Sequence, residues 1–520
     1  MKHLPNHMMP LATSLGVVPL YGDIHNHCAM SYGHGRLEDA LARARLQLDF
    51  VSVTGHAAWP DMPIDVPEVA HIVDFHVKGF ARLRKNWPAH FKTLQHYDDE
   101  GNFSVFPGYE IHSCAYGDQT IVYADLEPSD MQFAESPAEL RENLHRAKGS
   151  GALSFPHHIG YRHGARGIDW EAFEPSLSPF VEMFSMHGCA ETSESARGYL
   201  HSMGPVDGCS TMEAGLAAGH VFGIVGNTDH HSGFPGSYGH GRMGLYARGR
   251  DRAAIWSAMR ERQTNALTGD NIHLLTVVGD AIQGGIIPPQ ADAELIIEAV
   301  GGGAIDAIDI MRNGRIWHRI TPSLSPAPIT PESDGFIETM LHLELGWGAR
   351  GTSHRWLGEI ALEDGEILRV EPRFRGAEIV SPLEGEDAEH PMPSISIAGD
   401  KVRFEVTAEA NPNNVTPAMQ GMALHIRTAR KGRIRARLDD QEIVVPVKRL
   451  AEGALSGNLG PIDSPAYRFH ALPRPHEWQW QGSVGLGEFR NGENVYVRLS
   501  QTNGQMAWTS PVFCRQVSPS

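Results

Sequence analysis

Histidines gather in this sequence where short apolar runs end. The first case is the stretch YGDIHNHCAMSYGHG at residues 21–35. Its His25 and His27 alternate along an extended strand and therefore point to the same side. Two imidazoles on one face would repel each other if protonated, and would need hydrogen-bond partners if buried and neutral. A metal ion removes both problems, because imidazole is a common ligand of zinc, manganese and iron. This fragment alone supports a metal site and a polar loop end equally.

The same pattern recurs at five later apolar runs. The residues at these run ends are His56; Glu110 and His112; His157 and His158; His187; and Asp229, His230 and His231. One such cluster would be chance, but six successive strands that end in His, Asp or Glu are what a single polynuclear metal site requires. Of the 29 histidines, 22 lie in residues 1–273. We therefore predict that the chemistry belongs to the first half of the chain.

The elements that would position these residues alternate between strands and helices. Residues 37–47 have the pattern of an amphipathic helix, and residues 49–56 that of a strand. Ser136, three residues before Glu139, gives a capping-box signature at the start of a helix over 136–151. Such alternation is typical of βα units and a parallel sheet. We predict an α/β barrel whose active site lies at the carboxyl ends of its strands.

Composition limits the classes of protein to consider. A chain of 520 residues suggests two or three domains, and 41% hydrophobic with 20% charged residues indicates a globular protein. The net charge of −18 argues against nucleic acid and anionic membranes as partners, but not against a small anionic substrate. We find no run of 18 apolar residues and no signal peptide. Five scattered cysteines without CxxC spacing favour a reduced, cytoplasmic protein. The oligomeric state stays open.

The second half of the chain has a different pattern. It consists of alternating and β-branched runs separated by turn residues, with strong Asn-Gly hairpin signals at 313–314 and 503–504. We predict a metal-binding catalytic barrel over 1–272 and a β-rich, sandwich-like region over 273–520. The acidic, proline-bearing segment near 380–400 is predicted to be a linker or long loop.

Five motifs follow one another along the first half. They are HxH at 25–27, VTGH ending at His56, PGYE ending at Glu110, PHH at 156–158 and NTDHH at 227–231. In this order they resemble the polymerase and histidinol phosphatase (PHP) superfamily of metal-dependent hydrolases, and most closely its DUF3604 branch. Segments 258–274 and 495–513 also resemble that branch, so the likeness covers nearly the whole chain. It implies a distorted seven-stranded βα barrel that holds two or three divalent metal ions.

The resemblance also implies a set of metal ligands. They are His25, His27, His34, His56, Glu110, His157, Asp229 and His231. In this set Glu110 would bridge a first and a second metal, and Asp229 would complete the first. A third metal would take His56 and His231. Zn, Mn and Fe all suit histidine and carboxylate ligands, so the identity of the metal stays open.

Three positions depart from the superfamily's pattern. Gly55 stands where members commonly have Asp, which removes a carboxylate that would orient a ligand. His34 lies one residue later than its counterpart in members with three metals. Gln119 lies where related sequences have a histidine, so the second metal would either use Asp118 or His112 instead or bind weakly.

A site of this kind performs hydrolysis without a protein nucleophile, because the metals activate water. The predicted catalytic residues are Glu110, His187 and Asp229. We expect His187 to give the leaving group its proton, with His158 and His230 as alternatives. The predicted substrate-binding residues are His158, Arg162, His230 and Arg242. An arginine suits a phosphate or carboxylate, because its guanidinium matches planar oxyanions.

These observations predict a metal-dependent hydrolase, with a small phosphoester as the preferred substrate. One alternative is a metal-dependent amidase, esterase or lactonase that acts on a small carboxylate substrate. The other is a non-catalytic binding scaffold stabilised by metal, for which the departures at Gly55 and Gln119 are the best support. A scaffold would not need the full set of predicted ligands, which favours the enzyme.

Overall fold

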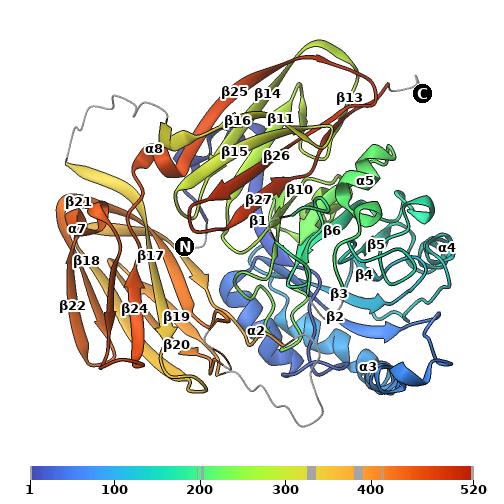
Figure 1. Ribbon diagram of the computed structural model, residues 1–520, viewed down its shortest axis with the longest axis horizontal. Coiled ribbons are helices and arrows are strands. Elements are labelled where there is room, and N and C mark those ends of the chain that lie inside the picture. The colour runs from blue at the N-terminus through green and yellow to red at the C-terminus, as the bar shows by residue number, and fades with distance from the viewer. Residues whose placement is uncertain are drawn as a thin grey trace.

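The computed structural model describes residues 3–195, 197–200, 204–324, 335–379, 391–411, 413 and 415–516. It has a mixed α/β part, coloured blue to green in Figure 1, and a β-rich part, coloured yellow to red. None of the helices among the described residues is both long and apolar enough to cross a membrane.

The mixed part contains the helices and strands that carry the predicted motifs. Its helices are α1 (Pro10–Leu15), α2 (Leu37–Gln47), α3 (Ala70–Tyr97), α4 (Pro137–Lys148), α5 (Met212–Ala217) and α6 (Arg252–Arg260). Its strands are β1 (Val18–Asp23), β2 (Phe50–Ala58), β3 (Ser104–Ile111), β4 (Gln119–Tyr123), β5 (Ala152–Pro156), β6 (Phe180–Ser185), β7 (Gly188–Cys189), β8 (Gly223–Gly226), β9 (Arg242–Ala247) and β10 (Thr264–Leu267). The predicted helix over 37–47 is confirmed, and the hydroxyl of Ser136 accepts from the N–H of Glu139 at the start of α4, as the capping signature indicates.

The sheet of this part is mixed, so the prediction of a parallel sheet is only partly right. Strands β1, β2 and β3 run parallel, but β4 is antiparallel to β3, and β5 is antiparallel to β4. The connection from β3 to β4 spans residues 112–118, which is too short for the crossover that a parallel pair needs. On the other edge, β9 is antiparallel to β1.

The predicted barrel is not confirmed as a closed sheet. Strands β6 and β8 pair with each other and, with β7, form a separate three-stranded sheet. Strand β5 contacts β6, and β8 contacts β9 and β10, so the two sheets lie side by side. Within the described part of the chain, no strand pairing joins β5 to β6 or β8 to β9. The arrangement brings the strand ends together, although the pairing among the described strands does not close into a barrel.

Helices α2 and α3 cover the sheet beside β2. Every residue of β2 is buried, which suits a strand covered on both faces. The apolar side chains of both helices form one core with the strands, and this core includes Leu41 on α2 and Leu83 on α3. The packing of these helices therefore fixes the position of the sheet and of the strand ends.

The β-rich part follows from residue 273. Its strands are β11 (His273–Val278), β12 (Ala281–Ile282), β13 (Ile286–Ile287), β14 (Gln290–Val300), β15 (Ile305–Arg312), β16 (Arg315–Ile320), β17 (Phe336–Trp347), β18 (His354–Arg373), β19 (Ser394–Ala398), β20 (Lys401–Ala408), β21 (Gln420–Leu438), β22 (Gln441–Pro446), β23 (Leu455–Asn458), β24 (Pro465–Phe469), β25 (Gln479–Phe489), β26 (Asn494–Gln501), β27 (Met506–Thr509) and β28 (Val512–Cys514). Two short helices, α7 (Val447–Glu452) and α8 (Pro475–Trp478), lie among them. Both Asn-Gly signals lie in hairpins, between β15 and β16 and between β26 and β27.

The two parts share one sheet. Strand β10 pairs with β27, with Asn265 opposite Thr509, so the sheet of the mixed part continues into strands from the end of the chain. An eight-stranded sheet built around β18 and β21 forms a separate layer, seen on the left of Figure 1. Residues 380–390 of the predicted linker lie outside the described residues, and 394–398 form β19. The domain boundary and the sandwich arrangement stay predictions.

Candidate metal centre

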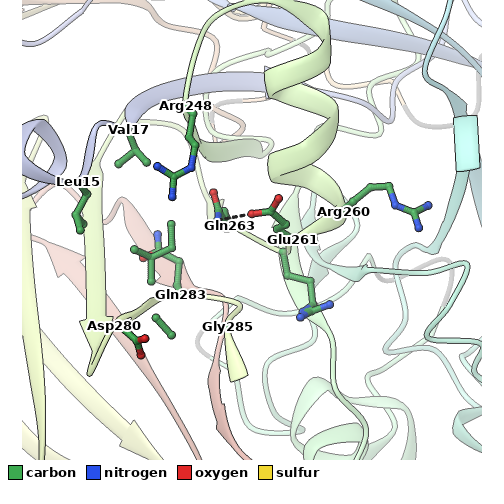
Figure 2. Close-up of a pocket in the computed structure, with 12 residues that line it drawn as sticks. Leu15, Val17, Arg248, Arg260, Glu261, Gln263, Asp280, Gln283 and Gly285 are labelled. Atoms are coloured by element: carbon green, nitrogen blue, oxygen red, sulfur yellow. Dashed lines mark hydrogen bonds between the residues drawn. The ribbon is translucent and has the colours of Figure 1, made fainter. Parts of the chain in front are cut away.

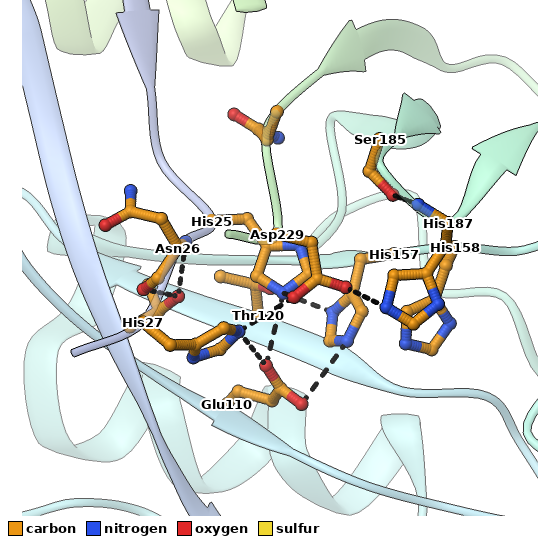
Figure 3. A network of polar contacts seen from close by, with 12 residues as sticks. His25, Asn26, His27, Glu110, Thr120, His157, His158, Ser185, His187 and Asp229 are labelled. Carbon is orange, nitrogen blue, oxygen red and sulfur yellow. Dashed lines mark hydrogen bonds and ion pairs between the residues drawn. The ribbon is translucent and has the colours of Figure 1, made fainter. Parts of the chain in front are cut away.

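The polar strand ends of the mixed part converge on one buried cluster. Its members, called the histidine–carboxylate cluster below, are His25, His27, His56, Glu110, His112, Asp118, His157, His158, His187, Asp229 and His231. None of them is more than 4% exposed to solvent. They follow β1, β2, β3, β5, β6 and β8 or lie at the ends of these strands, with Asp118 just before β4. Figure 3 shows many of these side chains pointing toward one another.

Glu110 lies at the middle of the cluster. The Nε2 atoms of five histidines surround its two oxygens, at 3.2 and 3.4 Å from Oε2 for His25 and His27, and at 3.6, 3.3 and 3.6 Å from Oε1 for His56, His112 and His157. A carboxylate with ligand atoms on both of its oxygens has the arrangement needed to bridge two cations.

Two more carboxylates complete the cluster. Asp229 Oδ1 lies 2.9 Å from His27 Nε2, and Oδ2 lies 2.7 Å from His187 Nε2. Asp118 Oδ2 lies 2.8 Å from His112 Nδ1 and is also bound by the guanidinium of Arg166. Each carboxylate therefore contacts imidazole nitrogen.

Several triplets of ligand atoms lie within 4.8 Å of one another, close enough to share one ion. Among the described residues these triplets include His25, His27 and Glu110; His27, His56 and His231; His56, Glu110 and His112; Asp118, His157 and His158; and His158, His187 and Asp229. Histidine with carboxylate is a donor set that zinc, manganese and iron accept. The residues present therefore fit more than one divalent ion.

In four of the histidines the outer ring nitrogen, Nδ1, is held by a neighbour. The pairs are His25 with Glu182 at 2.8 Å, His56 with Ser31 Oγ at 3.1 Å, His112 with Asp118 at 2.8 Å, and His157 with Thr120 Oγ1 at 2.8 Å. Metal-binding histidines almost always have such a bond, because it sets the tautomer and the direction of the ring. Here it leaves Nε2 aimed at Glu110.

Some buried nitrogens of the cluster lack any hydrogen bond. Within the described part of the chain, His27 Nδ1, His157 Nε2 and His158 Nδ1 have no hydrogen-bond partner. A buried polar atom without a partner costs about 1–3 kcal/mol, so native proteins seldom keep one without a reason. Binding of an ion by His157 Nε2 would remove that cost at one of these atoms.

The electrostatics of the cluster also suit cations. Burial raises the pKa of each of its three carboxyls, but the neighbouring imidazoles, and Arg166 for Asp118, outweigh burial, so the pKa lies well below the usual value for Glu110, Asp118 and Asp229. Burial, followed by nearby histidines, keeps the pKa well below its usual value in His56, His158 and His231. Ionised carboxylates and neutral imidazoles are the forms that bind metal.

Backbone strain is concentrated at the same place. His158, Arg166 and Asp229 have positive φ angles of 32°, 72° and 51°. Residues other than glycine seldom adopt this region, and such outliers gather at functional sites where the surroundings impose them. Here the strained backbone places two candidate ligands and the arginine that contacts Asp118.

The structure does not bring every predicted site residue to the cluster. Arg162 is exposed on the loop after β5. Arg242 is fully buried, and its guanidinium donates to Asn271, Gln47 and the carbonyl of Gly236. Its role is therefore to connect packed segments of the chain.

Two predicted histidines lie beside the cluster. The ring of His230 stacks on that of His240, with the ring centroids 5.5 Å apart. The backbone N–H of His34 donates to the carbonyl of His231, which places the loop of His34 next to this ligand strand. His158, predicted to bind substrate, lies among the ligand-type residues instead.

Three residues that contact the cluster were not among the predicted site residues. Glu182, fully buried on β6, holds the ring of His25 and accepts from the N–H of His158. A single acid in the apolar run FVEMFS was the available signal. Arg166 contacts Asp118 and His112, and the Tyr161 hydroxyl lies 2.6 Å from His187 Nδ1. Arg166 lies on the same loop as Arg162, and the position of that loop after a ligand strand was the available signal for it. No pattern in the sequence distinguishes Tyr161 from its neighbours.

Two of the three departures from the expected motif can be examined in the structure. A Cβ atom at Gly55 would lie 2.7 Å from Leu83 Cδ1, so an aspartate there would require the Leu83 side chain to move. Glu182 supplies a buried orienting carboxylate at another position. The side chain of Gln119 accepts from Ser154, whereas the preceding Asp118 joins the cluster.

A separate hollow of about 470 Å³ lies between the end of α6 and residues 280–285 (Figure 2). Its lining includes Arg248, Glu261 and Gln263, and no residue of the histidine–carboxylate cluster. It is therefore a different surface feature.

Comparisons with known proteins add little to this geometry. Neither a protein-family model nor a curated protein matches the chain. Among solved structures, the chain is similar to a two-domain protein containing a predicted PHP-like metal-dependent phosphoesterase from Bacteroides vulgatus ATCC 8482, with 13% identity and a TM-score of 0.31 over 83% of this chain and 96% of that one. It is also similar to PsfC from Pseudomonas syringae PB-5123, with 16% identity and a TM-score of 0.30 over 47% of this chain and 90% of that one. Such scores are too low to assign a function.

Proposed function

We propose that the chain is a metal-dependent hydrolase of small phosphoesters, with two or three divalent ions held by the histidine–carboxylate cluster. The observation that carries this proposal is the position of Glu110, whose two oxygens lie within 3.6 Å of the Nε2 atoms of five buried histidines. A purely structural cluster would not need so many imidazoles around one acid.

The triplets indicate which residues would hold which ion. A first ion would take His25, His27 and Asp229, with one oxygen of Glu110. A second would take the ligand atoms of Asp118, His157 and His158, and a third those of His56 and His231. When bound, divalent ions supply activated water and neutralise negative charge on the attacked group.

The net charge of the cluster supports an anionic substrate. Four buried carboxylates contact its imidazoles, and Arg166 is the cation paired with Asp118. Once the imidazoles are neutral, as metal binding requires, these side chains carry three negative charges, which would repel a phosphate. Two divalent ions would reverse the sign and leave a small positive charge, which attracts a phosphate.

His187 supports the proton transfer that a leaving group requires. Its Nε2 lies 2.7 Å from Asp229 Oδ2, and its Nδ1 lies 2.6 Å from the hydroxyl of Tyr161. Asp229 would stabilise a charged imidazolium. Burial raises the pKa of Tyr161, so its hydroxyl keeps its proton and can donate a hydrogen bond to Nδ1 of the neutral ring.

The proposal is tested by substrate panel and metal content together. Phosphomonoesters and phosphodiesters are offered beside amides, lactones and aryl esters, using the wild-type chain and Glu110→Gln. We expect phosphoester turnover that falls at least about 1,000-fold in Glu110→Gln, because the bridging carboxylate is lost. Glu338→Gln is the matched control, since Glu338 also contacts histidine but lies in the β-rich part. Full activity in Glu110→Gln, or turnover of amides alone, would refute the proposal.

A further inference from the structure

A groove of about 730 Å³ lies where three segments of the chain meet. The loop after β7 contributes Arg197, the loop before β9 contributes Tyr238, and the hairpin between β26 and β27 contributes Asn503. The eight-stranded sheet supplies the rest of the lining, including residues of β17 and β24. The volume is that of a small-molecule site. None of the lining residues belongs to the histidine–carboxylate cluster.

Three arginines line this groove, although the chain as a whole is acidic. They are Arg197, Arg375 and Arg468, and the imidazoles of His342 and His470 lie beside them. This concentration of guanidinium groups in a chain of net charge −18 is a local exception. Guanidinium groups bind oxyanions through paired N–H donors.

The carboxylates near the groove only partly balance these charges. Glu344 is the acid in the lining, and its Oε2 lies 2.6 Å from His470 Nε2. Glu378 lies 2.9 Å from Arg375 and neutralises it. Among the described residues, no ion pair engages Arg197 or Arg468, although Arg197 donates to the carbonyl of Gly504. The groove therefore keeps positive charge that is available to an anionic ligand.

Two nitrogens beside the groove have no hydrogen-bond partner. They are Nε2 of His342, which is only 7% exposed, and Nε of Arg375, in each case among the described residues. Both atoms are screened from solvent, so they add to the polarity of the groove wall but do not themselves face its opening.

The neighbouring cations already influence these groups. Burial lowers the pKa of His342 well below its usual value, and Arg373, His470 and Arg468 lower it further. Burial also lowers the pKa of Arg375, and Arg197 adds to this effect through repulsion. Such repulsion is relieved when an anion enters, so the effect agrees with the geometry.

An aromatic side chain borders the groove. Trp347 is 47% exposed and has a φ of 58°, a region that bulky residues almost never adopt. The strained backbone keeps a large apolar ring at the rim, where it offers a flat face to a ligand.

We propose that this groove binds a small molecule that carries a phosphate or carboxylate group, with Arg375 and Arg468 contacting the oxyanion and Trp347 contacting its apolar body. This site is separate from the metal centre, and the inference does not rest on the proposed hydrolysis. It rests on the cavity and on the three arginines that line it.

Calorimetric titration of the full chain with phenyl phosphate and with benzoate tests the proposal. The chain carries Glu110→Gln, so that the metal centre does not add its own binding. We expect one saturable site for at least one probe, weakened about tenfold or more by Arg468→Gln, because a charged hydrogen bond is lost. Arg248→Gln is the matched control, since Arg248 is also exposed but lines the other hollow. It should leave binding unchanged.

Each outcome of this experiment is decisive. Binding of phenyl phosphate alone assigns a phosphate ligand, and binding of benzoate alone a carboxylate ligand. Trp347→Ala should weaken phenyl phosphate but not inorganic phosphate. No saturable binding of either probe, or binding unaffected by both Arg468→Gln and Arg375→Gln, would overturn the proposal.

A second titration keeps the test valid if the double variant does not fold. In the chain without Glu110→Gln, Arg468→Gln should remove one class of site and leave binding at the metal centre. Phenyl phosphate hydrolysis that persists in Glu110→Gln would refute the proposed function, while the effect of Arg468→Gln on binding would still support the groove.

Discussion

Two buried charged regions of this molecule differ in how their charges are balanced. At the junction of the two parts, Arg373 contacts Asp270 at 3.1 Å and Glu371 at 3.2 Å, while Arg369 contacts Glu371 at 2.9 Å. These four side chains are at most 2% exposed, and their formal charges sum to zero. Tyr238 also donates to Asp270 at 2.7 Å, although Arg373 Nη1 has no hydrogen-bond partner among the described residues. The charges of these four side chains therefore balance one another without a bound ion.

The histidine–carboxylate cluster is buried to the same degree, but with Glu182 and Arg166 it carries three negative charges when every imidazole is neutral, and two when His25 is protonated. Buried charge without compensation is costly, and proteins keep it where a cation binds. The comparison teaches that burial of charge alone does not identify a functional site. A missing counter-charge is what identifies one. Each prediction below tests one of these two buried regions.

The largest effect is expected at Asp118. We expect Asp118→Asn to lower activity about 1,000-fold and to remove about one metal ion per chain, because it takes a charged ligand from His157 and His158 and leaves Arg166 unpaired. Steady-state kinetics and elemental analysis of the same preparation measure both. Unchanged metal content would mean that Asp118 only positions His112.

The junction should respond in stability rather than in chemistry. Asp270→Asn leaves Arg373 with a buried, partly unpaired charge, and breaking such a pair costs about 3–5 kcal/mol of unfolding free energy. Denaturant unfolding measures this loss. Turnover per folded molecule should stay near that of the wild type, and a selective loss of turnover would contradict the division between the two regions.

A smaller effect is expected at Glu182, which orients His25 without facing the centre of the cluster. Glu182→Gln should weaken metal binding about 10–100-fold, as the loss of an outer hydrogen-bond partner commonly does. Competition with a chelator of known affinity measures this change in metal affinity. Glu338→Gln should show no change, and an equal loss in that control would indicate a general effect on stability.

The smallest effect is on pH dependence. Burial lowers the pKa of His25, but Asp229, Glu182 and Glu110 outweigh burial, so the net pKa is raised well above its usual value. Without metal, His25 therefore keeps its proton at neutral pH, and a metal must displace it. We expect affinity to fall about tenfold per unit as pH decreases from 8 to 6, one proton being linked to binding. Affinity independent of pH would contradict this.

Local signals in the sequence predicted helices and their caps well, but predicted strand pairing and side-chain contacts poorly. The helix over 37–47 and the cap at Ser136 depend on nearby residues, and both are found as expected. The convergence of strand ends was also predictable, because each polar residue follows its own apolar run. The antiparallel turn of β4 was not predicted, since the pairing of a strand depends on the length of the connection before it.

Contacts between distant segments explain the remaining differences. Arg242 was predicted to bind substrate because arginine is a residue type that binds anions. Its partners Gln47 and Asn271 approach it only after folding. Glu182 reaches His25 across 157 residues, which no local pattern reveals. Leu83 of α3 packs against Gly55, a contact between distant segments that the local motif does not reveal.

The number of metal ions per chain tests the central claim most directly. Mass spectrometry of protein purified without chelator, beside a metal-stripped control, gives this number and the identity of the metal. The uncompensated charge of the histidine–carboxylate cluster predicts two or three tightly bound divalent ions. Folded protein that binds one ion or none would contradict the account, because the buried carboxylates would then be balanced in another way.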